Sequence, residues 1–209
     1  MPDKRETISA DAILLAATGL VRRLGEAKTN MVDIGKALGV SHAALYRLYP
    51  SKTAIMDAIV REAMDDETEL AGQWLDRDGP AGDRLLHMIL DIHQRKRSRF
   101  NGEREIHDLY RRVMVERPDM IRAYADRMTR LIGALIAQGV ERGEWRVSDV
   151  SLAAGVVRDG VTPFVHPQFV ALAVEAGAPV EDQLRAMVMT LTKAFEAGID
   201  YSSPMALRP

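Results

Sequence analysis

The chain has 209 residues, 47% hydrophobic and 28% charged, a composition typical of a globular protein with one or two domains. It contains no cysteine, which excludes disulfides, cysteine nucleophiles and thiolate metal sites. The net charge of −2 conceals an asymmetry that favours a polyanionic partner at one end: residues 1–52 carry eight basic and five acidic side chains, and the remainder 20 basic and 25 acidic.

The N-terminal segment MPDKRETISAD lacks the apolar core of a secretory signal. No run of apolar residues approaches the length of about 18 that a membrane-spanning helix needs. We therefore expect a cytoplasmic protein with no membrane partner.

Residues 7–24 predict an amphipathic helix, because apolar residues recur at helical spacing along one face. These residues are Ile13, Ala16, Ala17, Leu20 and Leu24. Arg22 and Arg23 fall in the last turn, where cations suit the helix dipole, and Gly25 offers a stop.

The stretch from Thr29 to Lys52 predicts two short helices joined by a tight turn. Asn30 can cap the first helix by accepting a hydrogen bond from a free backbone N–H, and Gly39 can end it in the left-handed conformation. Ser41 can cap the second helix, so that the sequence G-V-S spans the turn. A helical hairpin of this size is what a helix-turn-helix requires.

The second helix of this hairpin, residues 41–48, has two different faces. Its expected buried residues are Ala44, Leu45 and Leu48, which leaves His42, Ala43, Tyr46 and Arg47 on the other face. The helix is slender enough for a major groove about 12 Å wide. Tyr46 and Arg47 can donate to phosphates, whereas Ala43 offers only a methyl contact, so we expect firm backbone binding and modest reading of bases.

Three features of this region resemble the N-terminal domain of TetR/AcrR-type transcriptional regulators at that family's spacing. They are the G-V-S turn, the block Leu45-Tyr46-Arg47-Leu48-Tyr49 and the cap Pro50-Ser51-Lys52. The resemblance covers about residues 8–60. It implies an all-α fold, with an N-terminal three-helix helix-turn-helix DNA-binding domain and a C-terminal helical ligand-binding and dimerisation domain.

We place the DNA-binding domain, called the head below, at residues 1–52, completed by the start of a long helix over 52–74. The effector-binding and dimerisation domain, called the body, is expected at 53–202. Residues 203–209 are expected to form a disordered tail.

The resemblance also implies which head residues contact DNA. They are Thr29, Asn30, Val32, Ser41, His42, Ala43, Ala44, Tyr46, Arg47 and Lys52. Thr29 and Lys52 stand where the family contacts phosphate, and His42 and Ala43 where it meets base edges. Tyr46 stands where the family contacts phosphate or a thymine methyl. The implied partner is double-stranded DNA with a palindromic operator.

Beyond residue 74 the sequence predicts only further helices. They are expected over 83–99, 103–116, 119–142, 148–165 and 180–200, with a short helical turn in QFVALAVEAG. Ser148 is the expected N-cap of the 148–165 helix. The basic residues Arg95, Lys96, Arg97 and Arg99 fall in the last turn of their helix, so we expect a solvated helix end there.

A small-molecule pocket is expected between the helices of the body, a favoured place for one in helical bundles. The candidate lining residues are Met64, Met88, His93, His107, Tyr110, Met114, Tyr124, Met128 and Arg158. Taken singly, each of these methionines is better explained as core packing. The resemblance supports the pocket as a whole, for an effector that the sequence does not identify.

Two apolar stripes on the last long helices predict a homodimer interface. The stripes are Leu152, Val156, Gly160 and Phe164, and Leu184, Met187, Val188, Leu191 and Phe195. Two such stripes could form a four-helix bundle across a two-fold axis, or could instead close the core of one chain. A dimer also suits DNA reading, because one short helix reads too few base pairs for useful specificity.

Enzymatic motifs are missing: the sequence has no glycine-rich phosphate loop, no G-x-S-x-G and no H-E-x-x-H. We expect no catalytic residues, cofactor or metal, although a metal site built from His93, His107 and Asp108 stays open. The favoured function is a sequence-specific DNA-binding transcriptional regulator, acting as a ligand-responsive homodimeric repressor. The alternative is a helical scaffold, small-molecule-binding protein or enzyme whose helix-turn-helix is structural.

Overall fold

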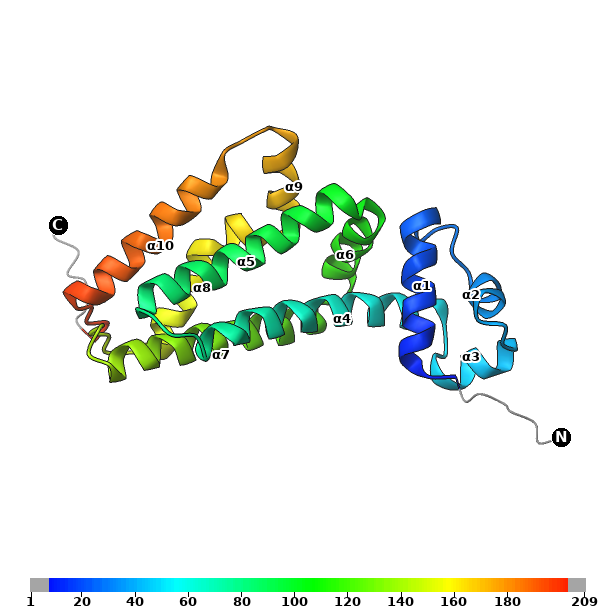
Figure 1. Ribbon diagram of the computed structural model, residues 1–209, viewed down its shortest axis with the longest axis horizontal. Coiled ribbons are helices and arrows are strands. Elements are labelled where there is room, and N and C mark those ends of the chain that lie inside the picture. The colour runs from blue at the N-terminus through cyan, green and yellow to red at the C-terminus, as the bar shows by residue number, and fades with distance from the viewer. Residues whose placement is uncertain (1–7, 203–209) are drawn as a thin grey trace.

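The computed structural model describes residues 8–202, which form ten α-helices and no strand within that range. Figure 1 shows the head at one end of an elongated molecule and the body at the other. This confirms the all-α fold. The tail predicted for residues 203–209 lies outside the described residues.

Three helices make up the head: α1 (Ala10–Leu24), α2 (Met31–Leu38) and α3 (His42–Leu48). The predicted caps are confirmed. Asn30 Oδ1 accepts from the Asp33 N–H at 2.9 Å, and Gly39 ends α2 with a φ of 65°. Ser41 Oγ then accepts from the Ala44 N–H at 3.3 Å, so the turn between α2 and α3 is closed at both sides.

The long helix α4 (Lys52–Gly72) leaves the head and runs along the body beside α7 (Figure 1). Ser51 caps it, its hydroxyl accepting from the Ala54 N–H at 3.1 Å. A 3-10 turn, Gln73–Leu75, ends it. One rigid element therefore connects the two parts of the chain.

The remaining helices form the body. They are α5 (Ala81–Gly102), α6 (Arg104–Glu116), α7 (Pro118–Glu141), α8 (Val150–Val165), α9 (Pro167–Glu175) and α10 (Val180–Ala197). The prediction that Ser148 caps α8 is wrong, because Asp149 caps that helix. The Ser148 hydroxyl instead accepts from the Tyr201 N–H at 2.8 Å. Within residues 8–202, no helix is long and apolar enough to cross a membrane.

The head has no core of its own. Ile34 of α2 and Leu45 of α3 belong to the same apolar cluster as Ile55 of α4 and Val113 of α6. Leu48, predicted to be buried, is 41% exposed because α3 ends there and turns toward α4. A movement of α4 or α6 would therefore act directly on the packing of the head.

Candidate DNA interface and ligand site

One face of α3 is free to meet a partner. Leu45 turns inward and is fully buried, while His42, Ala43 and Arg47 are exposed and Tyr46 is 44% exposed. The rings of His42 and Tyr46 lie edge to face with centroids 4.7 Å apart, which restrains both side chains. The face predicted from the sequence is thus presented by the fold.

On α2, Val32 is 50% exposed, and Asn30 is exposed at the start of the helix. Ala44, on α3 itself, is half-buried. Because the side-chain oxygens of Asn30 and Ser41 already cap helices, any contact with DNA would use their remaining hydrogen-bonding capacity.

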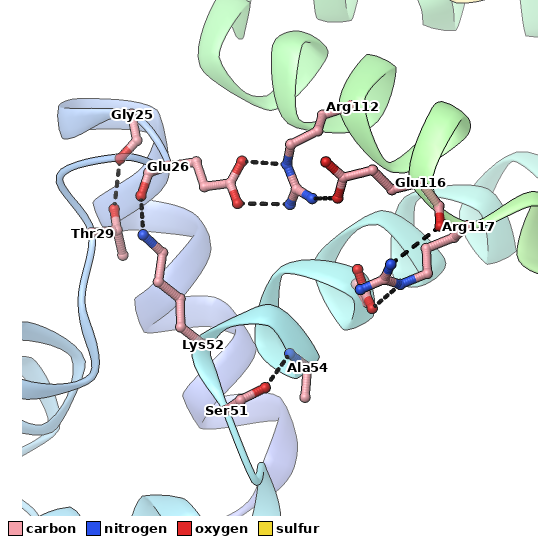
Figure 2. Close-up of polar contacts among 10 residues, drawn as sticks. Gly25, Glu26, Thr29, Ser51, Lys52, Ala54, Arg112, Glu116 and Arg117 are labelled. Atoms are coloured by element: carbon pink, nitrogen blue, oxygen red, sulfur yellow. Dashed lines mark hydrogen bonds and ion pairs between the residues drawn. The ribbon is translucent and has the colours of Figure 1, made fainter.

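Two of the predicted phosphate contacts are occupied within the protein (Figure 2). Thr29 is fully buried and its hydroxyl donates to the Gly25 carbonyl at 2.9 Å, which does not fit a contact with phosphate. The Lys52 ammonium donates to the Glu26 carbonyl at 2.6 Å. Both side chains close the loop between α1 and α2, a role that spacing alone does not reveal.

Charged pairs join the head to the body at the same loop. Glu26 accepts two hydrogen bonds from the Arg112 guanidinium of α6, at 2.7 and 2.6 Å, and Arg112 also pairs with Glu116 (Figure 2). Nearby, Arg117 donates to Asp57 of α4 at 2.7 Å. This bidentate pairing of Glu26 with Arg112 fixes the relative orientation of the two side chains as well as neutralising their charges.

A buried ionic cluster lies in the body, where a solvated helix end was predicted. Lys96 and Arg99 of α5 are 3% and 7% exposed, and each places a nitrogen 2.5 Å from a carboxylate oxygen of Glu67. Arg95 and Arg97 are exposed, as predicted. The prediction was wrong for Lys96 and Arg99, because these two residues, three apart, face inward on the same side of α5.

Glu67 of α4, fully buried, receives hydrogen bonds from three other helices. Besides Lys96 and Arg99, the hydroxyls of Tyr110 of α6 and Tyr124 of α7 donate to it at 3.3 and 2.8 Å. The Lys96 ammonium also lies 4.3 Å from the centre of the Tyr110 ring. We call these five residues the Glu67 cluster.

The cluster perturbs the pKa values of its members. Burial alone would raise the pKa of Glu67, but Lys96 and Arg99 outweigh it and hold that pKa below its ordinary value. Burial lowers the pKa of Lys96 in spite of Glu67. Burial, reinforced by the charge of Glu67, raises the pKa of Tyr110 and of Tyr124 well above 10.0, so both hydroxyls remain donors.

A cavity of about 230 Å³ adjoins the cluster between α5, α6, α7 and α8. Its predicted lining residues are Tyr110, Met114, Tyr124, Met128 and Arg158, all of which do line it. The wall that was not predicted includes Lys96, Ile89, Ile132, Val161 and His166. The cavity is therefore apolar over most of its surface and carries cationic groups.

The other four predicted lining residues lie elsewhere. Met64 and Met88 are fully buried in the two apolar cores. His93 is buried and its Nδ1–H donates to the Phe164 carbonyl at 2.7 Å. His107 packs edge to face on Phe100, and burial lowers its pKa to about 4. These side chains support the fold and do not reach the cavity.

Metal-ligating residues do not gather in the part of the chain that the structure describes. No three side chains of His, Asp or Glu converge there in a way that could hold an ion. His93 and His107 instead have the packing roles given above, which removes the ground for a site with Asp108.

Two family models match the chain. A model described as "Bacterial regulatory proteins, tetR family" matches residues 13–59, and one described as "Tetracyclin repressor-like, C-terminal domain" matches residues 81–194. Together they span the head and most of the body. The chain belongs to the TetR family.

Solved structures of regulators share the fold of this TetR-family chain. SmeT, the repressor of the Stenotrophomonas maltophilia multidrug efflux pump SmeDEF, is 18% identical with a TM-score of 0.61, over 97% of this chain and 96% of that one. FadR from Bacillus subtilis, solved with stearoyl-CoA, is 16% identical with a TM-score of 0.55, over 92% and 100%. Reduced NemR from E. coli is 15% identical with a TM-score of 0.60, over 87% and 95%.

Membership of the TetR family confirms the predicted resemblance and identifies the chain as a DNA-binding transcriptional regulator with a helix-turn-helix head. This family is not enzymatic. The individual residues that contact DNA, effector or a second subunit stay predictions.

Part of the predicted dimer surface is used within the chain of this TetR-family protein. Leu184, Val188 and Phe195 of α10 are fully buried in its own core, so this part of the prediction is wrong. Phe164 and Leu191 are half-buried against the same core, and a β-carbon added at Gly160 would lie 3.7 Å from the Met187 sulfur. Leu152, Val156 and Met187 remain 48%, 37% and 37% exposed.

Proposed function

We propose that this TetR-family regulator binds a palindromic operator as a homodimer, represses transcription there, and releases the DNA when a small molecule enters the cavity. The observation that carries the proposal is the course of α4. The helix begins at Lys52, which is hydrogen-bonded into the head, and passes Glu67, which is hydrogen-bonded into the wall of the effector cavity.

The exposed face of α3 supports operator binding. Tyr46 and Arg47 could donate to phosphates beside a major groove, and His42 and Ala43, exposed on the same helix, could face base edges. Asn30, Val32, Ser41 and Ala44 would complete the contact. Binding to a bacterial chromosome would also require a cytoplasmic location.

The exposed apolar residues Leu152 and Val156 of α8 and Met187 of α10 support a homodimer. They come from two helices that pack on one another, so a second copy could add its own pair across a two-fold axis. Two heads would then read half-sites about 34–36 Å apart.

Two polar links would carry a change in the body to the head. Arg117, at the start of α7, holds Asp57 of α4, and Arg112 of α6 holds Glu26 in the loop before α2. A ligand that favoured a different position of α4 or α6 would bind the DNA-incompetent form better, by the roughly 1–3 kcal/mol typical of allosteric coupling.

In vitro selection from random duplexes with the purified protein tests this function. We expect an inverted repeat whose half-sites lie about one helical turn apart. A protein without DNA function would enrich no common sequence, and a monomer would enrich a single half-site.

The dimer is tested separately by sedimentation. Leu152→Glu combined with Met187→Glu should give a monomer, because four charges would be buried in each two-fold interface. Val115→Glu is the matched control, since Val115 of α6 is 82% exposed and lies outside the proposed surface. A double variant that sediments as the wild type does would reject this interface.

A further inference from the structure

The Glu67 cluster contains more positive than negative charge. Lys96 and Arg99 pair with one carboxylate, that of Glu67, and the two tyrosines contribute no charge because burial keeps their hydroxyls protonated. The charge of Glu103 also acts on Arg99, whereas Glu67 is the one acidic group of the described residues that acts on Lys96. All three charged side chains are at most 7% exposed. An uncompensated buried cation is costly in a protein interior, so the cluster would gain from one further negative charge.

The surplus charge faces the cavity. Lys96, Tyr110 and Tyr124 line the cavity, whereas Glu67 and Arg99 do not. No carboxylate is among the lining residues, all of which belong to the described part of the chain. The guanidinium of Arg158, which also lines the cavity, already pairs with Asp159 at 2.8 Å.

Most of the remaining wall is apolar, apart from Arg158, Thr162 and His166. Ile89, Met128, Ile132 and Val161 surround the space beyond Lys96. The volume of about 230 Å³ lies below the range of roughly 300–1,000 Å³ that is usual for drug-sized ligands. The cavity therefore suits a small molecule with one polar end.

We propose that the cavity binds a small apolar carboxylic acid, with its carboxylate on the Lys96 ammonium beside the Tyr110 and Tyr124 hydroxyls. This inference rests on the effector role proposed above for the cavity. A single carboxylate matches the surplus of one positive charge. A neutral ligand would leave that surplus in place, and an amine would add to it.

The same contact would link the ligand to α4. Lys96 and the two tyrosines donate to Oε2 of Glu67, so a bound carboxylate competes with Glu67 for the same three donors. Glu67 would keep Arg99, which contacts its other oxygen, Oε1. The acid would thus weaken the hydrogen bonds by which α5, α6 and α7 are attached to α4 at Glu67.

Calorimetric titration of the full chain with octanoate, 1-octanol and octylamine tests the proposal. We expect octanoate to bind at least about tenfold more tightly than the alcohol, as a charge-assisted hydrogen bond in a buried site provides. The amine should bind more weakly than either.

Two variants with opposite expectations separate recognition from folding. Lys96→Met leaves Glu67 and Arg99 as a neutral pair and should abolish the preference for octanoate over octanol. Glu67→Gln removes the competing carboxylate and should strengthen octanoate binding by about tenfold. Arg97→Met is the matched control, because Arg97 is an exposed neighbour on α5 that does not line this cavity.

The proposal is overturned if the wild type prefers the alcohol or the amine, if it binds none of the three probes, or if Lys96→Met keeps the preference. Its failure can be told from failure of the proposed function. Octanoate that binds through Lys96 without releasing the selected operator would contradict ligand-responsive repression alone. Release of the operator by an amine or a neutral molecule would contradict only the proposal that the ligand is a carboxylic acid.

Discussion

Removal of the Glu67 carboxylate should cost more stability than any other change in the buried cluster. In Glu67→Leu, Lys96 and Arg99 stay buried with no counter-charge, and the hydroxyls of Tyr110 and Tyr124 lose their acceptor. Breaking a buried ion pair by removing one partner costs about 3–5 kcal/mol of unfolding free energy. Lys96→Met should cost only about 1–2 kcal/mol, because Glu67 keeps Arg99 and loses one charged hydrogen bond.

Urea denaturation at neutral pH measures both losses, provided that the slope against urea is unchanged. Glu69→Leu is the control, since Glu69 is exposed on the same helix and its replacement should alter the free energy by no more than about 0.5 kcal/mol. If Glu67→Leu cost less than Lys96→Met, the surplus of positive charge in the cluster would be refuted, and the proposed acid site with it.

Two further predictions concern α7 and α6. A β-carbon at Gly139 would lie 2.6 Å from the Trp145 ring, so Gly139→Ala should lower the unfolding free energy by about 1–3 kcal/mol. At Gly133 the nearest atom would be 3.6 Å away, so Gly133→Ala should not lower that free energy. Thermal melts that show equal losses of stability for the two variants would contradict this prediction. Because burial lowers the pKa of His107 to about 4 from 6.5, the unfolded chain takes up its proton first, and stability should fall as the pH drops from 6.5 to 4 by at most about 1.4 kcal/mol per pH unit. In His107→Phe, urea midpoints measured at several pH values should decrease less with falling pH than those of the wild type. An equal decrease in the variant would show that His107 is not the cause of the pH dependence.

The head could be predicted in detail because its signals are local. Asn30, Gly39, Ser41 and Ser51 each act on backbone groups within a few residues, so their spacing determines where the helices begin and end. Thr29 did not follow the prediction, because its hydroxyl closes the preceding turn instead of facing solvent.

The cavity could be predicted only in part, because its polar end depends on contacts between distant residues. Glu67 lies 29 and 32 positions before Lys96 and Arg99, and no local pattern tells that these cations face inward. On α10, likewise, periodicity identified an apolar face without telling whether it packs on the same chain or on a second copy. Leu184 and Met187 belong to one predicted stripe, yet the first is buried and the second 37% exposed.

The proposed function depends first on binding of the operator by the exposed face of α3. Fluorescence anisotropy with the selected operator measures it most directly, for the wild type, for Tyr46→Ala combined with Arg47→Ala, and for the body variant Arg122→Ala as control. The α3 variant should bind at least about tenfold more weakly, and the slope of log affinity against log salt should shrink by about 0.9 for the phosphate contact of Arg47. An affinity and a salt slope unchanged from the wild type would contradict the assignment of α3 as the DNA-reading helix.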